Sequence, residues 1–140
     1  QQMINSGDLK MEKSSKIKER SFDFALSIII LYSELKNSSE FVLSKQLLRS
    51  GTSIGANVHE ASAASSKRDF LNKMTIASEE ARETEYWIKL LTESRITTID
   101  FTAYLNEITE LNKMLTSIVK TTKESLTQNS KLNSPTANQN

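Results

Sequence analysis

The chain has 140 residues, of which 37% are hydrophobic and 25% charged, and this is enough for one domain with its own core. Three glycines, one proline and long stretches of apolar periodicity predict an all-α protein. The absence of cysteine excludes a disulfide framework and a thiolate metal site. The apolar run 22–32 is interrupted by Asp23 and Ser27 and is far shorter than a membrane span of about 20 residues. We therefore expect a cytoplasmic protein that does not enter a membrane.

The net charge of +1 is unevenly distributed along the chain. Residues 1–20 hold five basic and three acidic side chains, residues 21–110 hold nine and thirteen, and residues 111–140 hold four and one. The body is therefore mildly acidic and both ends are basic. Nucleic-acid binding would need positive charge that is gathered by the terminal segments or by the symmetry of an oligomer.

Three segments are expected. Residues 1–14 are polar and lack periodicity, and residues 123–140 are rich in Asn, Ser, Thr and Gln and contain the only proline. Both compositions predict disordered tails. The range 15–122 between them is predicted to be a four-helix bundle.

The first helix is expected over about residues 15–35. Its core stripe is Ile17, Phe24, Ile28, Leu31 and Leu35. An adjacent apolar stripe is formed by Ala25, Ile29 and Tyr32. The combined apolar arc is wider than a surface helix needs, which predicts that part of it contacts a second partner.

Three further helices follow, with short connections that favour an antiparallel up-down-up-down bundle. The second, about 39–65, is preceded by Asn37 and Glu40, which resemble a capping box. The third opens with Ser66 as its cap, and the fourth with Thr97. The expected core positions are Leu47, Ile54, Val58 and Ala61 on the second helix, Phe70, Met74, Ala77, Ala81, Thr84, Ile88 and Leu91 on the third, and Phe101, Leu105, Ile108, Leu111, Leu115 and Ile118 on the fourth.

Two glycines, Gly51 and Gly55, lie four residues apart on one face of the second helix. Each costs about 1 kcal/mol relative to alanine in a helix interior. Close approach of another helix offsets that cost through dispersion contacts, and the natural counterpart is the stretch from Ala77 to Ala81. The functional alternative is a local kink or a backbone contact with a ligand.

A polar strip on the second helix has two interpretations. The strip is Arg49, Ser53, Asn57 and Glu60. The third helix carries Glu80 and Glu83 on one face. These side chains either form two solvated faces or share a polar network, with Arg49 or Asn57 bonded to a glutamate, that fixes the register of helices or subunits.

Neither a catalytic nor a cofactor-binding residue is predicted. His59 is the only histidine, and no glutamate lies three residues before it, which excludes a carboxylate-bridged di-iron bundle. No phosphate-binding loop or nucleophile elbow is present, so we expect neither a metal nor an enzymatic activity. Tyr86, Trp87 and Tyr104 are interpreted as core or interface residues rather than as a stacking platform for bases.

The stretch 43–91, with its blocks RSGTSIGANVHEA, KRDF and EARETEYWIKLL, resembles the bacterial four helix bundle protein family, together with FALSIIILYSEL upstream. Members of this family were first noticed as proteins encoded in intervening sequences of 23S ribosomal RNA genes. The resemblance implies an antiparallel four-helix bundle that assembles as a ring-like homopentamer, without a known enzymatic activity. A related branch is the accessory variability protein of diversity-generating retroelements, whose basic pentamers bind nucleic acid and partner a reverse transcriptase. The acidic body of this chain departs from that branch.

The leading hypothesis is a non-catalytic, homo-oligomeric scaffold or interaction protein. The alternative is a nucleic-acid-binding accessory protein that partners RNA or a reverse transcriptase. Its contacts would be Lys10, Lys13, Lys16, Lys18 and Arg20. A third hypothesis, an enzyme that uses the clustered glutamates, has neither a metal site nor a substrate to support it.

Overall fold

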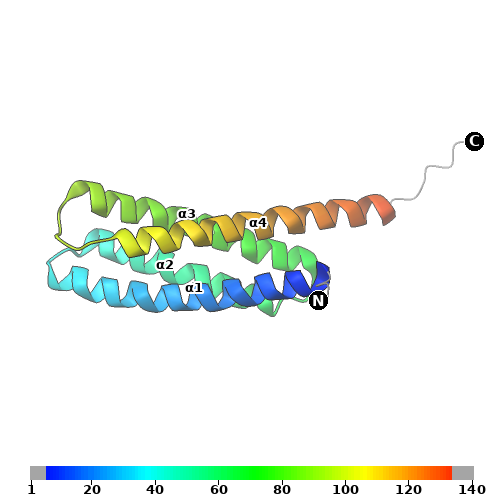
Figure 1. The fold of residues 1–140 in the computed structure, drawn as a ribbon, viewed down its shortest axis with the longest axis horizontal. Coiled ribbons are helices and arrows are strands. Elements are labelled where there is room, and N and C mark those ends of the chain that lie inside the picture. Colours follow the sequence, from blue (N-terminus) through cyan, green and yellow to red (C-terminus); the bar gives the residue numbers. More distant parts are fainter. Residues whose placement is uncertain (1–5, 134–140) are drawn as a thin grey trace, which may run out of the picture.

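The protein is an all-α four-helix bundle (Figure 1). The computed structural model describes the backbone of residues 6–133 and the side chains of residues 12–132, and no strand occurs in that range. The helices are α1 (Ser6–Asn37), α2 (Val42–Ser62), α3 (Lys67–Ser94) and α4 (Thr102–Asn133). Each helix packs against the next in the chain, and the smallest contact joins α1 to α4. The α2–α3 turn lies at the end of the bundle where α1 begins, and the other two connections lie at the opposite end (Figure 1).

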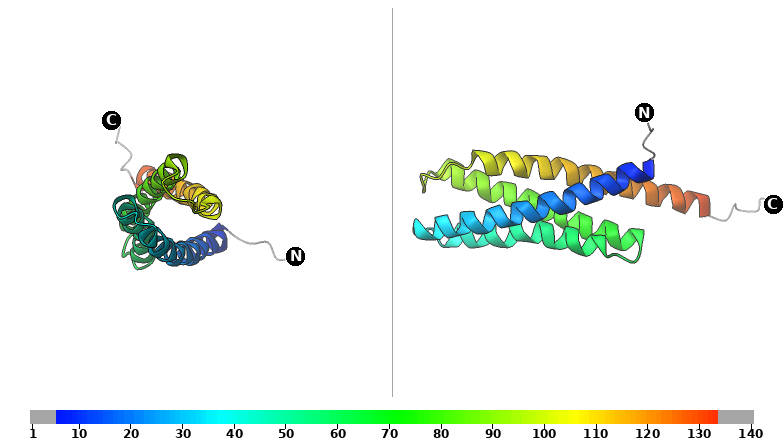
Figure 2. Two further views of the ribbon diagram at one scale, coloured as in Figure 1. Left: turned by 90° about the vertical axis from the view of Figure 1, so that its left-hand side faces the viewer. Right: turned by 60° about the horizontal axis from the view of Figure 1, so that its bottom comes forward.

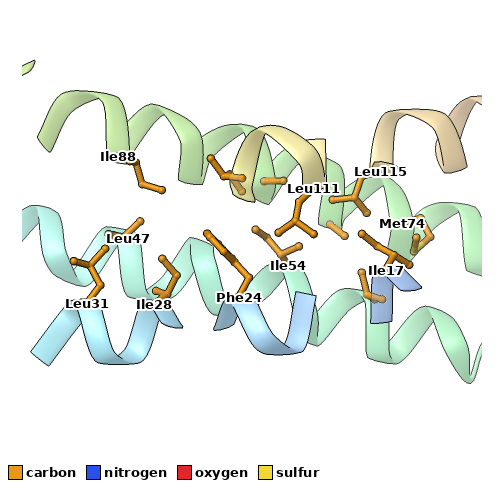
Figure 3. Close-up of a cluster of buried hydrophobic side chains, with 14 of the residues drawn as sticks. Ile17, Phe24, Ile28, Leu31, Leu47, Ile54, Met74, Ile88, Leu111 and Leu115 are labelled. Atoms are coloured by element: carbon orange, nitrogen blue, oxygen red, sulfur yellow. The ribbon is translucent and has the colours of Figure 1, made fainter. Parts of the chain in front are cut away.

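The core confirms the apolar seams predicted for all four helices. Every predicted core position is buried except Phe70 and Leu105, which are half-buried and pack against the core. Figure 3 shows Phe24, Ile54 and Leu111 meeting between the helices. The middle of the α3 seam is Ala77 and Ala81, both without exposed surface. Burial of these side chains removes their apolar surface from water, which stabilises the folded bundle through the hydrophobic effect.

The cap predicted for α3 is confirmed, and the one predicted for α2 is wrong. The Ser66 hydroxyl accepts a hydrogen bond from the Asp69 amide at 3.1 Å. Asn37 is the last residue of α1, and α2 begins only at Val42. Glu40 instead accepts from the first amides of α2. Ser39, with a left-handed φ of 68°, lies in the connection between the two helices.

The cap predicted for α4 is also wrong. The helix begins at Thr102, and Asp100 accepts a hydrogen bond from its amide at 2.9 Å. Thr97 lies in the preceding connection. Arg95 ends α3 in a left-handed conformation with φ 54°, a common way for a helix to end.

Helix extends into both segments that composition predicts to be disordered. α1 begins at Ser6 and α4 continues to Asn133, whereas residues 1–5 and 134–140 lie outside the described part of the chain. For the C-terminal segment, contacts with the start of α3 and partial burial accompany the helix. The Lys67 ammonium donates to the Ser125 hydroxyl at 2.6 Å, and Leu126 is half-buried.

The two glycines of α2 pack against α1, which corrects the prediction that they face Ala77 and Ala81 of α3. A Cβ atom on Gly51 would lie 2.9 Å from Cγ2 of Ile28. A Cβ atom on Gly55 would lie 3.1 Å from the carbonyl oxygen of Ser21. Helical periodicity defines the face that the glycines share, but it does not say which neighbour that face meets.

We expect Gly51→Ala to destabilise the bundle, although alanine gains about 1 kcal/mol of helix propensity. The added methyl group meets the β-branched and fully buried side chain of Ile28, and overpacking of this kind costs about 1–3 kcal/mol. Urea denaturation measures the change. The control is Ala56→Gly at an exposed position of the same helix, which reports propensity alone. A stabilised Gly51→Ala variant would contradict the close contact.

Candidate functional site

Arg49 of α2 links to two glutamates of α3. Its Nη1 atom donates to Glu80 at 3.1 Å, and its Nη2 atom donates to Glu83. Glu83 also accepts from the indole nitrogen of Trp87 at 3.1 Å. Steps of three and four residues place the three α3 side chains on the helix face toward α2. We call Arg49, Glu80, Glu83 and Trp87 the Arg49 network.

A hydroxyl pair lies beneath this network. Ser50 and Thr84 are fully buried, and their hydroxyl oxygens are 2.9 Å apart. The Thr84 hydroxyl also donates to the carbonyl of Glu80 at 2.7 Å. Buried hydroxyls need satisfied partners, and a shift of α2 along α3 would separate this pair. The pair and the Arg49 network therefore specify one register for the α2–α3 hairpin.

The rest of the predicted polar strip does not join the network. The Ser53 hydroxyl donates to the carbonyl of Arg49 at 2.6 Å, and the Asn57 amide donates to the carbonyl of Ser53 at 2.9 Å. Glu60 is exposed. The prediction that Asn57 could bond a glutamate is therefore wrong. A short polar side chain in a helix can reach the backbone carbonyl four residues earlier on its own helix, and Asn57 bonds that carbonyl instead.

The charges of the network stabilise one another. The hydrogen bond from Arg49 holds the pKa of Glu83 below its ordinary value, and the bond from Trp87 adds to this effect. The same contact raises the pKa of Arg49. The Arg49 side chain is 47% exposed, so water screens the pair and its contribution to stability is modest.

A second ion pair joins α1 to α4. Arg20 makes a bidentate contact with Glu107, from Nε at 3.0 Å and from Nη2 at 2.9 Å. Arg20 was predicted as a nucleic-acid contact, but its guanidinium is engaged within the bundle. Lys13, Lys16 and Lys18 are exposed, and the side chain of Lys10 lies outside the described residues.

An exposed apolar stripe runs along α1. Phe22, Leu26, Ile29 and Ile30 follow at helical spacing, and their exposure ranges from 48% for Leu26 to 63% for Phe22. Ile29 belongs to the adjacent stripe seen in the sequence, whose other members Ala25 and Tyr32 are half-buried. We call these four exposed residues the α1 stripe. Beside it, Phe22, Gly55 and His59 line a shallow hollow of about 330 Å³.

Positive charge collects at the end of the bundle that holds the α2–α3 turn. Residues 12–20, 59–73 and 116–132 lie there (Figure 1), and they hold ten Lys and Arg against five Asp and Glu. Residues 21–58 and 74–115 hold seven against eleven. We call this end the basic pole. Its cations are Lys13, Lys16, Lys18, Arg20, Lys67, Arg68, Lys73, Lys120, Lys123 and Lys131.

The three aromatic residues weighed as a stacking platform, Tyr86, Trp87 and Tyr104, lie in two places. Trp87 packs against the core, and Tyr86 meets its ring edge-on with centroids 5.3 Å apart. Tyr104 lies in the groove between α1 and α4, with Asp23 and Phe24.

Among the described side chains, no group of three or more His, Cys, Asp or Glu residues is placed to hold a metal ion. Within the same part of the chain, no helix is both long and apolar enough to cross a membrane.

We expect Arg49→Met to lower the free energy of unfolding by about 1 kcal/mol at pH 7, since it removes the cation and keeps an apolar stem. The pKa of Glu83 is lower in the folded protein than its ordinary value of 4.5. The contribution of the ion pair to stability is therefore complete above pH 4.5 and is lost as the pH falls through the lower pKa of the folded state. The difference between the two proteins should therefore shrink near pH 3. Urea denaturation at both pH values measures it.

Lys113→Met is the control for this variant, because Lys113 forms only an exposed pair with Glu110. Its effect should stay within about 0.5 kcal/mol at both pH values. An Arg49→Met variant that behaves like this control would contradict a stabilising network.

Known proteins share this fold and sequence pattern. The chain is 49% identical to a protein of unknown function from the S23 ribosomal protein family of Bacteroides thetaiotaomicron, over 77% of this chain and 98% of that one, with a TM-score of 0.73. No curated protein matches the chain. The model of the 23S rRNA-intervening sequence protein family matches residues 13–117. The resemblance noted in the sequence is thereby confirmed, and the chain belongs to the 23S rRNA-intervening sequence protein family.

Proposed function

We propose that the protein is a non-catalytic cytoplasmic scaffold, an antiparallel up-down-up-down bundle that assembles as a ring-like homopentamer. The observation that carries the proposal is the α1 stripe. Its four large apolar side chains lie next to one another on a helix face that no other part of the described chain covers. A contiguous exposed apolar surface marks an interaction site on a protein.

A second copy of the chain is the partner that this stripe fits. Full burial of one such side chain contributes about 1.5–3 kcal/mol, so four half-exposed ones can drive association. In a closed ring the two sides of each contact are different surfaces, so the stripe needs a second apolar patch. Candidates for that patch are the exposed apolar side chains Phe41, Val42, Ile76, Tyr86 and Ile96, whereas the exposed Leu132 lies apart from them at the end of α4. The number of five copies is what the family resemblance implies.

The substitution Ile30→Glu is expected to lower the native mass, because it places a charge in the stripe where burial would desolvate it. Light scattering on a sizing column measures the mass, and circular dichroism checks the helix content. Leu132→Glu makes the same chemical change at an exposed apolar position at the end of α4, away from the stripe and from the candidate second patch, and should leave the native mass unchanged. A wild-type monomer, or an Ile30→Glu variant of unchanged mass, would contradict the proposal.

The basic pole supports a second candidate function, a nucleic-acid-binding accessory protein whose partner is RNA or a reverse transcriptase. The N-terminal lysines are part of a larger cluster of positive charge, because α3 and the C-terminal half of α4 add six cations to the same end of the bundle. In a cyclic ring every copy points the same way, so the basic poles would form one face. Such a face attracts a polyanion that comes within about one Debye length, the distance over which salt screens a charge.

RNA binding by this face should weaken steeply with salt and show little sequence preference. We expect Lys120→Gln with Lys123→Gln to reduce both the affinity for a single-stranded RNA and the slope of its salt dependence. Fluorescence anisotropy measures both quantities. Lys89→Gln with Lys113→Gln removes the same charge far from the basic pole and is the control. A salt-insensitive affinity, or equal losses in the two double variants, would contradict this function.

A further inference from the structure

An open cavity of about 630 Å³ lies at the basic pole, between the start of α1, the α2–α3 turn and the C-terminal half of α4. The turn is made of small residues, Ala63, Ala64, Ser65 and Ser66, so no large side chain fills this end of the bundle. The ring of Phe70 and the side chain of Ile118 form the apolar floor. The volume is that of a site for a small organic molecule, and such sites are mostly apolar with a few placed polar groups.

Two lysines border this apolar floor. Lys13 comes from α1 and Lys67 from the first turn of α3, and both line the cavity. Neither forms an ion pair with a described carboxylate. Among the described side chains, the Lys67 ammonium bonds the neutral hydroxyl of Ser125, at 2.6 Å. Two cations without a described carboxylate partner beside apolar surface favour an anionic head group with an apolar body.

We propose that this cavity binds an amphipathic carboxylate, such as a medium-chain fatty acid. The carboxylate lies between Lys13 and Lys67, and the apolar body covers Phe70 and Ile118. The site is independent of the scaffold proposal, because the α1 stripe takes no part in it. It is also distinct from nucleic-acid binding by the basic pole, since an apolar floor offers nothing to a phosphate backbone.

Titration calorimetry of the full chain with decanoate tests the proposal. Decanoate should bind with a Kd of about 10–100 μM, which lies within the upper bound on affinity for a ligand of about twelve non-hydrogen atoms. Decanol lacks the charge and acetate lacks the apolar body, so each should bind at least about tenfold more weakly. Absence of decanoate binding, or acetate binding as tight as decanoate binding, would overturn the proposal.

Variants separate this site from general attraction to the basic pole. Lys13→Gln with Lys67→Gln should weaken decanoate binding about tenfold or more. Lys16→Gln with Lys120→Gln removes the same charge from exposed positions at the same pole that do not line the cavity, and should change the Kd less than about twofold. Equal losses in the two double variants would overturn the assignment of the carboxylate to this cavity.

A cavity-filling variant gives a second test if the lysine variants prove unstable. Thr121 is exposed and lines the cavity, so Thr121→Trp fills the space without disturbing the buried core. Decanoate binding should be lost while the helix content is kept. Light scattering with and without decanoate completes the test. An unchanged mass supports a small-molecule site, whereas a fall in mass on decanoate addition would mean that another copy of the chain occupies the cavity and would overturn the proposal.

Discussion

The close contact between α1 and α2 is the constraint on which the rest of the molecule depends. Gly55 leaves no side chain between the helices, so the backbone of α1 at Ser21 comes within contact distance of α2. This contact turns Ile28 toward the core and leaves Phe22 and Ile30 on the outer surface. The two glycines therefore do more than permit packing. They orient α1 so that one of its apolar faces lies on the outer surface of the bundle.

Polar contacts complement this packing by fixing how far the helices slide along one another. The Arg49 network and the pair of Ser50 and Thr84 act at the α2–α3 interface, and Arg20 with Glu107 acts between α1 and α4. A third polar link joins α3 to α4, where the Asn112 amide donates to Glu85 at 2.6 Å. Apolar seams with similar residues at each level tolerate shifts, whereas directional hydrogen bonds do not.

The four helices, their core seams and the excess apolar arc of α1 were predictable, because each depends on periodicity within one helix. The pairing of Arg49 with Glu80 and Glu83 was one of two interpretations of the polar strip, and it could be considered because a short turn makes successive helices neighbours. The neighbour of Gly51 and Gly55 and the charge pairing of Arg20 were not, since they depend on which helices meet in space. The basic pole also escaped detection, because residues 67–73 were counted with an acidic body that extends to the other end of the bundle.

The dominance of contacts between successive helices has a consequence for how the chain folds. Contacts that are local in sequence form fast, because little loop-closure entropy opposes them. Among the contacts between helices, the α1–α4 contact is the only one that spans nearly the whole chain, and it is also the smallest. Figure 2 shows the two helices from two further sides. We therefore expect the α1–α4 contact to be the last interface to close during folding and the first to open in the native state, so that local unfolding starts on the α1–α4 side.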